Sequence, residues 1–303
     1  MEVINITTVL LLGFPGSYNF RISFFLFVFV IYILTICGNL LVITLVSYSK
    51  NLHCPMYFFL TQLTTSDIIL SSDIVPTMLH VVLNNGFSLL LPTCFTQYFI
   101  FTHCEVLECF LLTVMSYDRY LAICKPLHYH TMMTSFHCVK YIILSWILGF
   151  SVSLVLTVNL SRLQFCKSNI IDHFFCDINP LIELSCSNVL RMRLLATLMC
   201  IPVLVCPFLV VVVSYIYIVH TIIRIRSTTR GQKAFSTCGS HLAVVSIFYG
   251  TLVSIYMTPE RGKYTALRKI ISIVYTMLTP LSNPIIYCLR NEDIKKAFRK
   301  ITL

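Results

Sequence analysis

Long stretches without a charged residue dominate the pattern of polar and hydrophobic positions along the chain. Five of them are uninterrupted: residues 22–49, 141–161, 194–223, 234–259 and 270–289. An α-helix rises about 1.5 Å per residue, so each stretch is long enough to cross a hydrocarbon core of about 30 Å. The pattern therefore predicts several helices that span a membrane.

Two further spans carry acids within mostly apolar sequence: residues 55–83 with Asp67 and Asp73, and residues 94–118 with Glu105 and Glu108. All backbone groups in a bilayer must be satisfied internally, which a helix achieves. The sequence thus predicts an all-α membrane protein, a seven-transmembrane helix bundle over residues 22–289. Its spans are expected at roughly 22–49, 55–83, 94–118, 140–161, 194–223, 234–259 and 270–289.

The composition agrees with a membrane location. Of 303 residues, 57% are hydrophobic and 11% are charged, and the mean hydropathy of +0.84 lies outside the range of ordinary soluble domains. The net charge is +10. Because the basic residues frame the predicted spans instead of forming one groove, we expect contact with an anionic lipid surface and no nucleic acid partner.

The Lys and Arg positions predict that residues 1–21 form an extracellular N-terminus. Cytoplasmic segments are enriched in these residues. The Asn5-Ile6-Thr7 sequon supports this orientation, because glycosylation at Asn5 requires the lumenal side. Residues 1–21 lack a typical cleavable signal peptide, so the first span is expected to act as a signal anchor. Thirteen of the 22 basic residues then lie inside: Lys50, Arg119, Lys125, Lys140, Arg224, Arg226, Arg230, Lys233, Arg290, Lys295, Lys296, Arg299 and Lys300.

The fourteen cysteines divide by this topology. Cys94, Cys166, Cys176 and Cys186 fall outside, where disulfides persist, and four cysteines permit three pairings. An even number within one short region favours bridging over free thiols. Most of the other ten are expected to be free thiols within or near helices.

Several short strings, in order along the chain, carry a family resemblance. They are Gly38-Asn39, LHCPMYFFL (residues 52–60), Asp67, MSYDRYLAICKPLHY (115–129), Ser214-Tyr215, KAFSTCGSHL (233–242) and PLSNPIIYCLRN (280–291). Together they make the chain resemble an odorant (olfactory) receptor of the rhodopsin-like G-protein-coupled receptor family. Ser116 and Ser282 depart from the residues usual in that pattern.

By this resemblance, Arg119 takes part in coupling to a heterotrimeric G protein. A guanidinium is costly in lipid unless it is paired, and the resting receptor is expected to hold Arg119 locally, beside Asp118. Outward movement of the sixth helix would then open a cavity for the G protein. The alternative is a merely structural ion pair. Residues expected to serve activation and coupling are Asp118, Arg119, Tyr120, Tyr215, Lys233, Asn283, Pro284 and Tyr287.

Helical spacing places the acids of the third span. At 100° per residue, Glu108 lies about 20° and Glu105 about 40° from Arg119 around the helix axis, on opposite sides. Both acids therefore face the bundle interior, as intramembrane charges should. By resemblance, the set Asn39, Asp67, Glu108 and Asn283 forms a polar core that holds a sodium ion. A hydrogen-bonded network that shares a proton, without an ion, is an equal alternative.

The ligand is expected between the helices, beneath the outer loop. Expected pocket residues are Phe101, Cys104, Glu105, Met199, Val203, Tyr249, Leu252, Tyr256 and Thr276. For each apolar member, ordinary helix packing is as good an explanation as ligand contact. Glu105 is more informative, because a carboxyl in a pocket pairs with an amine or donates to a carbonyl. We therefore expect a ligand with at least one polar group.

The outer loop contains His173, Cys176 and Asp177, which could be taken for a metal site. The resemblance instead pairs Cys94 with Cys176 and Cys166 with Cys186, and a disulfide sulfur is not a thiolate ligand. No metal is expected there. Residues 290–303 form the cytoplasmic tail, in which Ile294, Phe298 and Ile301 recur at helical intervals among Lys and Arg. This spacing predicts a short amphipathic helix on the inner leaflet.

The resulting prediction is a receptor and not an enzyme, with no cofactor apart from the sodium ion just considered. A small odorant would bind within the bundle, and a stimulatory, olfactory-type G protein would raise cyclic AMP. The location implied by resemblance is the plasma membrane, in sensory cilia. A rhodopsin-like receptor for a non-volatile messenger is the alternative. An ion-coupled transporter would also use intramembrane acids, but the sequence shows no paired repeats with interrupted helices.

Overall fold

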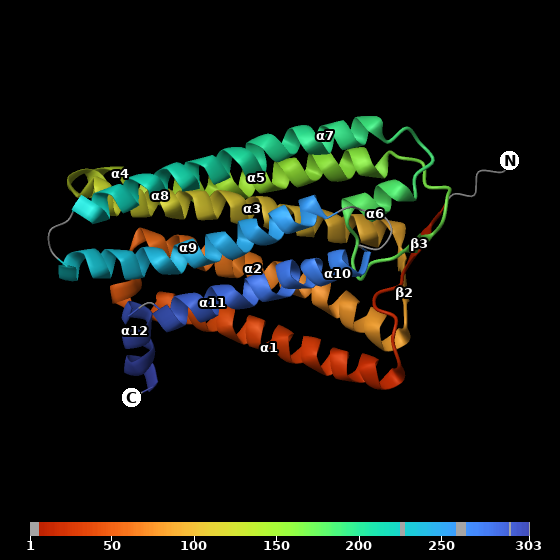
Figure 1. Ribbon diagram of the computed structural model, residues 1–303, viewed down its shortest axis with the longest axis horizontal. Coiled ribbons are helices and arrows are strands. Elements are labelled where there is room, and N and C mark those ends of the chain that lie inside the picture. Colours follow the sequence, from red (N-terminus) through yellow and green to blue (C-terminus); the bar gives the residue numbers. More distant parts are fainter. Residues whose placement is uncertain (1–5, 225–227, 259–264, 291, 303) are drawn as a thin grey trace.

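The computed structural model describes residues 6–224, 228–258, 265–290 and 292–302. Seven helices in it are long and apolar enough to cross a membrane, which confirms the predicted seven-helix bundle. The first four are α1 (Tyr18–Tyr48), α2 (Pro55–Asn84), α3 (Leu91–Cys124) and α5 (Ser135–Ser161). The sixth is α9 (Thr228–Met257). Figure 1 shows them running side by side along the long axis of the molecule.

The fifth and seventh spans each contain a wider, π-helical turn. In the fifth, Ile201–Val205 joins α7 (Leu190–Cys200) to α8 (Cys206–Arg224), and in the seventh, Val274–Leu278 joins α10 (Thr265–Ile273) to α11 (Thr279–Arg290). Pro202 lies in the first of these turns, where its missing N–H interrupts the regular ladder of hydrogen bonds.

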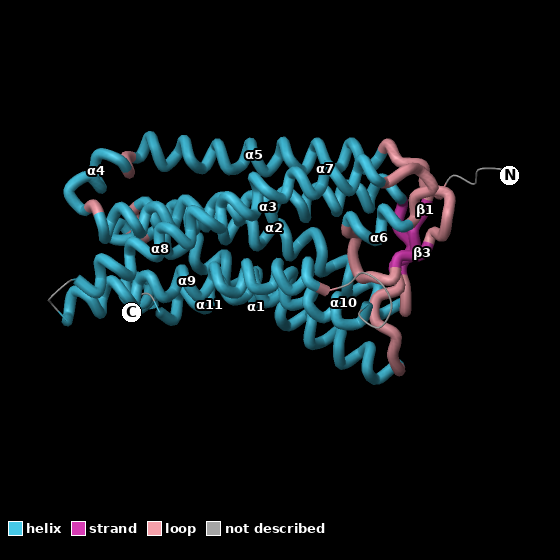
Figure 2. The backbone as a smooth tube through the Cα atoms, turned by 45° about the horizontal axis from the view of Figure 1, so that its top comes forward, coloured by secondary structure: helices cyan, strands magenta, loops and turns pink. Residues whose placement is uncertain are grey.

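Short elements occupy the two ends of the bundle. The end where the chain begins, called here the N-terminal end, carries β1 (Thr8–Leu11), β2 (Phe87–Leu90), β3 (Ile170–Ile171) and α6 (Ile178–Glu183). The opposite, C-terminal end carries α4 (Tyr129–Met132), α12 (Glu292–Thr302) and the 3₁₀ turns Lys50–Leu52 and Pro126–His128. Figures 1 and 2 show this separation.

The strands are an addition to the predicted all-α fold. They form one sheet in the order β2-β1-β3, in which β1 pairs antiparallel with β2 (Thr8 with Leu90) and parallel with β3 (Leu10 with Ile170). Backbone groups of connecting segments need hydrogen-bond partners as much as those of helices do. The sheet satisfies them and ties the start of the chain to two loops.

The bundle places apolar side chains on its outside, as a lipid-facing surface requires. Leu26, Phe27, Leu198 and Ile216 are all more than half exposed. Polar side chains such as Asp67 are instead buried between the helices. The third helix is the most enclosed of the seven spans in the described structure, and the fifth span is the least buried. It therefore positions most of the interior chemistry.

Close helix crossings depend on two glycines. A Cβ on Gly38 of α1 would lie 3.1 Å from Cγ of Pro284 on α11, and one on Gly149 of α5 would lie 3.0 Å from Nδ1 of His103 on α3. Both distances are shorter than ordinary van der Waals contact. Small residues at such points let transmembrane helices approach closely.

The tail residues 292–302 form α12, which turns across the end of the bundle and packs against α1, α11 and the turn Lys50–Leu52 (Figure 1). Ile294 and Ala297 are buried in that contact, whereas Phe298 is 44% exposed. Ile301, a further member of the predicted apolar stripe, has its side chain outside the described part. The exposed Phe298 beside exposed Lys296 and Arg299 gives α12 an amphipathic outer surface.

Candidate functional site

A cavity of about 270 Å³ lies near the N-terminal end, between α3, the fifth span, α9 and α10. Five of the predicted pocket residues line it: Phe101, Glu105, Met199, Val203 and Leu252. Tyr98, Phe175 and Tyr275 add aromatic rings, and Asp177 adds a second carboxylate. At about 30 Å³ per water-sized group, the space accepts a ligand of roughly nine non-hydrogen atoms.

Three predicted pocket residues do not line this cavity. Cys104 is fully buried and faces Ser66 of α2, because it points well to one side of the inward face of α3. Tyr249 packs against Phe208 of α8, at 4.8 Å between ring centroids. Thr276 donates to the carbonyl of Ser272 on its own helix, at 2.7 Å.

The neighbour of Tyr249 takes the inward position on α9. Phe248 is fully buried, and its ring lies 6.1 Å from that of Tyr275. Successive residues are about 100° apart on a helix, so Phe248 and Tyr249 cannot face the same way. The remaining predicted pocket residue, Tyr256, has its side chain outside the described part of α9.

A larger groove of about 1480 Å³ runs along α8 and α9 on the lipid-facing side, and contains Tyr215 and Tyr249. It meets the cavity at residues that line both: Ile178, Asn179, Ala196, Cys200, Leu204 and Leu252. The groove is open, and exposed residues such as Ile216 belong to its lining. Bilayer lipid would fill it, so the smaller cavity, with its polar groups, is the site suited to a selective ligand.

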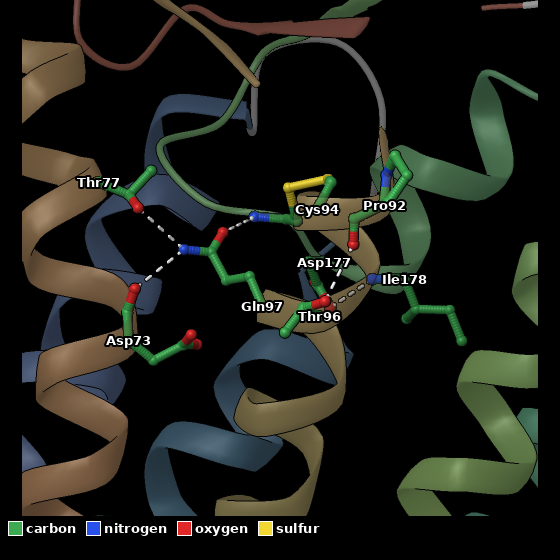
Figure 3. Close-up of a disulfide and its surroundings, with 9 residues drawn as sticks. Asp73, Thr77, Pro92, Cys94, Thr96, Gln97, Asp177 and Ile178 are labelled. Atoms are coloured by element: carbon green, nitrogen blue, oxygen red, sulfur yellow. Dashed lines mark hydrogen bonds between the residues drawn. A yellow bond between two sulfur atoms is a disulfide. The ribbon is translucent and has the colours of Figure 1, made fainter. Parts of the chain in front are cut away.

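The outer loop closes the cavity through a disulfide and one glutamine. Cys94 of α3 is bonded to Cys176 of the loop, and a second disulfide joins Cys166 to Cys186, the two pairings implied by the resemblance. The Gln97 side chain accepts from the Cys176 N–H at 2.9 Å and donates to the Asp73 carbonyl of α2 at 3.1 Å, as Figure 3 shows. The sequence analysis did not identify Gln97. Its position one helical turn from Cys94 could have indicated that its side chain lies beside the disulfide.

Aromatic packing follows directly after β3. The His173 ring lies 4.7 Å from both Phe174 and Phe175, and Phe175 in turn meets Phe101 at 5.0 Å. Phe175 lines the cavity, and His173 and Phe174 pack behind it, so this aromatic cluster forms the roof of the cavity. Burial, together with the nearby charges of Lys269 and Arg268, lowers the pKa of His173 to about 3, so the imidazole is neutral at physiological pH.

Lys269 of α10 joins three segments at this end. Its buried ammonium pairs with Asp172 of the loop and donates to the backbone carbonyl of Gly13 at 2.6 Å. It also lies 5.8 Å from the ring of Phe14. These contacts hold the segment before α1 and the outer loop against the seventh span. Sequence reasoning assigned Lys269 no role.

The polar core lies deeper, and brings three of the four predicted residues into contact with one another. Asn283 donates to the Asp67 carboxylate at 2.9 Å, and the Glu108 carboxyl faces that of Asp67 closely enough to share a proton. Asn39 instead donates to the carbonyls of Thr35 and of Pro280, which links α1 to the seventh span.

Several acceptors of this core lack a hydrogen-bond partner among the described residues. They are one carboxyl oxygen each of Asp67 and Glu108 and the amide oxygens of Asn39 and Asn283. Oxygen donors of this kind suit a hard cation such as sodium. No group of three or more His, Cys, Asp or Glu side chains arranged for a metal occurs in the described part of the chain.

The third part of the site lies around Arg119, at the C-terminal end of α3. Arg119 pairs with the buried carboxylate of Asp118 through Nε at 3.1 Å and Nη2 at 2.6 Å. Tyr129 of α4 donates its hydroxyl to the same carboxylate at 2.8 Å. Arg119 is therefore held locally. Helical spacing along α3 could not reveal Tyr129 as a partner, because Tyr129 lies beyond the end of that helix, in α4.

A buried histidine links the helices next to this pair. The two ring nitrogens of His241 on α9 contact the Tyr215 hydroxyl of α8 at 2.7 Å and the Leu112 carbonyl of α3 at 3.2 Å. Tyr287 is buried, with no hydrogen-bond partner for its hydroxyl in the described structure. His241 thus joins three helices, and moving α9 away from α3 must break its contacts.

Other predicted coupling residues lie around this network. The Tyr120 ring meets Tyr217 of α8 at 5.9 Å, and so faces the fifth span instead of Arg119. Pro284 packs on Gly38. The side chain of Lys233 and the whole of Asn5, the predicted glycosylation site, lie outside the described residues.

The arrangement of an interior cavity, a polar core and a restrained arginine within seven helices defines a rhodopsin-like receptor fold. The crystal structure of squid rhodopsin superposes with a TM-score of 0.74, covering 95% of this chain and 86% of that one at 17% identity. At this identity the likeness shows the fold alone.

Closer relatives show the family. A family model described as olfactory receptor matches residues 27–303. Olfactory receptor 11L1 of Homo sapiens is 43% identical, covering 99% of this chain and 94% of that protein; olfactory receptor 1468 of Rattus norvegicus is 40% identical, covering 98% and 94%. The chain belongs to the olfactory receptor family. It is therefore a multi-pass membrane receptor that binds small molecules and signals through a G protein, and it is not an enzyme.

Proposed function

We propose that the chain is an odorant receptor that binds a small, volatile organic molecule in the 270 Å³ cavity and activates a stimulatory, olfactory-type G protein. The cavity supports this most directly. It is small and mostly apolar, it lies beneath the outer loop, and it is lined by the same helix, α3, that carries Arg119 at its other end. A volatile molecule of roughly nine non-hydrogen atoms matches that volume.

Activation proceeds by a shift between two arrangements of the bundle. A ligand between Phe101, Met199 and Leu252 contacts α3, the fifth span and α9 together, and it favours whichever arrangement gives it better contacts. In the active one, α9 moves outward at the C-terminal end, the His241 contacts to Tyr215 and to α3 break, and Arg119 is released towards the G protein. Nucleotide exchange on that protein then raises cyclic AMP.

The same proposal fixes the orientation in the membrane. The N-terminal end, with its two disulfides, faces the extracellular side, where disulfides persist. The C-terminal end and α12 face the cytoplasm, with Lys296 and Arg299 towards anionic lipid. The receptor resides in the plasma membrane, in sensory cilia.

The polar core would hold either a sodium ion or a shared proton. Asp67, Glu108, Asn39 and Asn283 supply the oxygens for an ion, and the facing carboxyls of Asp67 and Glu108 would share the proton in its absence. A measurement of thermal stability against sodium concentration separates the two. Sodium-dependent stabilisation that disappears in Asp67→Asn supports the ion, and stability independent of sodium supports the proton.

The test of the function is cyclic AMP production in cells that express the tagged receptor with the olfactory-type G protein. A chemically broad odorant panel is applied, and Arg119→Ala, compared at equal surface level, is the matched control. We expect at least one volatile compound to raise cyclic AMP in the wild type and none to do so in the variant. A response to non-volatile messengers alone, or signalling that needs a different G protein, contradicts the proposal.

A further inference from the structure

We propose that the ligand of this receptor is a small protonated amine, held by the carboxylate of Glu105 within a ring of aromatic side chains. This inference rests on the proposed ligand site and adds the chemical class of the ligand. It comes from the deep part of the cavity, where a carboxyl group, a phenol hydroxyl and aromatic rings favour a positive charge.

Glu105 is the main polar group on the cavity wall. It lies eleven residues beyond Cys94, or about 16 Å down α3, well inside the membrane-spanning part. Its side chain is partly accessible although it is deep in the bundle, and it lines the cavity. No cation of the described residues forms an ion pair with it. An isolated carboxylate at this depth is costly, and a ligand cation would offset that cost.

A second polar group points to the same place. Tyr275 of the seventh span is only 1% exposed and lines the cavity opposite α3. Its hydroxyl faces the Glu105 carboxyl but does not reach hydrogen-bonding geometry, so it has no partner among the described residues. A buried hydroxyl without a partner is unfavourable. An ammonium between Glu105 and Tyr275 would donate to both oxygens.

The surrounding rings also suit a cation. Phe101 lies 5.0 Å from Phe175 and 6.1 Å from Tyr275, so three aromatic rings cluster on the cavity wall that also carries Glu105. Tyr98 lies close to the carboxyls of both Glu105 and Asp177. Aromatic faces attract ammonium groups within about 6 Å, most strongly where water is excluded.

The lining contains one guanidinium among the described residues, that of Arg268. It could instead receive an anionic ligand, such as a carboxylate. Arg268 is seven residues before Tyr275, about 10 Å nearer the N-terminal end, and its charge acts on His173 in the roof. The deep part of the cavity thus has Glu105 as its charged group, and a ligand that fills it meets an acid.

The binding test uses the full receptor, purified into lipid nanodiscs. Cyclohexylamine and benzylamine are the probes, because alkylamines are protonated at neutral pH and both fit the volume. Cyclohexanol and benzyl alcohol are neutral counterparts, and cyclohexanecarboxylate and benzoate are anionic ones. Ligand-induced stabilisation against heat gives the apparent affinity of each compound. We expect the amines to bind at least tenfold more tightly than the alcohols, and the carboxylates to bind most weakly.

Variants assign the preference to Glu105. In Glu105→Gln, which keeps the shape and removes the charge, the preference for amine over alcohol should fall by about 10- to 100-fold, as expected for loss of a charge-assisted hydrogen bond. Glu105→Asp should keep part of it. Glu183→Gln, an exposed acid of α6 away from the lining, is the matched control and should keep all of it.

Three results would overturn the inference. They are equal binding of alcohols or carboxylates, an amine preference that survives in Glu105→Gln, and no amine binding by a receptor whose thermal transition shows it to be folded. Cyclic AMP measurements separate this inference from the proposed function. If the amines bind but do not raise cyclic AMP, the proposed G-protein coupling is wrong and the amine site stands. If neutral odorants raise cyclic AMP equally in the wild type and in Glu105→Gln, the amine inference is wrong and the proposed function stands.

Discussion

Protonation of His173 should destabilise the roof of the cavity, and His173→Phe should remove this effect. The imidazole is 7% exposed and packs against Phe174 and Phe175, with no hydrogen-bond partner for Nδ1 in the described structure. Burial and the charges of Lys269 and Arg268 lower its pKa to about 3, from about 6.5 in an unfolded chain.

The direction in which stability changes with pH follows from the lower pKa of His173 in the folded state. Above pH 6.5 the residue is neutral in both states and has no effect on the pH dependence. Below it, the unfolded state takes up a proton that the folded state rejects, so stability is lost as the pH falls from 6.5 towards 3. Between pH 7.5 and 5.0 the loss of stability is about 2 kcal/mol, because each pH unit below the pKa of the unfolded state costs about 1.4 kcal/mol.

Thermal unfolding of the purified receptor in nanodiscs, at several pH values from 7.5 to 5.0, measures this effect. For a chain of this length about 2 kcal/mol corresponds to a fall in Tm of about 3 °C. The His173→Phe variant keeps an aromatic ring that cannot be protonated and should lack that contribution. His80→Phe, the same change at an exposed histidine, controls for loss of an imidazole. An identical pH slope in the wild type and in His173→Phe would refute the reasoning.

Three other changes should act on packing and covalent constraints. Cys176→Ser opens a disulfide that spans 82 residues and should cost about 4 kcal/mol, seen as loss of surface expression beside a matched Cys37→Ser receptor. Gly149→Val pushes α5 away from His103 and should cost about 1–3 kcal/mol in thermal unfolding, whereas unchanged stability would contradict the close crossing. Lys269→Met removes the pair with the outer loop and should speed protease cleavage before α1; an unchanged rate would exclude a restraining role.

The sequence predicted the bundle well because the bilayer imposes a simple rule. A span must be about 20 apolar residues long and must satisfy its own hydrogen bonds, and local composition reveals both properties. Helical periodicity also indicated that Glu105 and Glu108 face inward. The strands β1, β2 and β3 were missed, because each has four residues or fewer and pairs with segments distant in the chain.

Periodicity could not separate the roles of those two acids. They are three residues apart, hence about 60° around the axis and 4.5 Å in depth. That small difference directs Glu108 towards Asp67 of α2 and Glu105 into the cavity opposite Tyr275. Which neighbour each acid meets depends on how the helices are rotated and packed, information that a single helix does not contain.

The sequence by itself determined the membrane location, the seven helices and, through its motif strings, the family. Tertiary structure alone decided which inward-facing residues share a cavity: Phe248 instead of Tyr249 packs on Tyr275, Cys104 turns to α2, and Gln97 fastens the loop over the ligand site. The physical reason is the distance along the chain over which each property is determined. Burial in lipid is set by each segment's own composition, whereas a site is set by contacts between segments that lie far apart in the sequence.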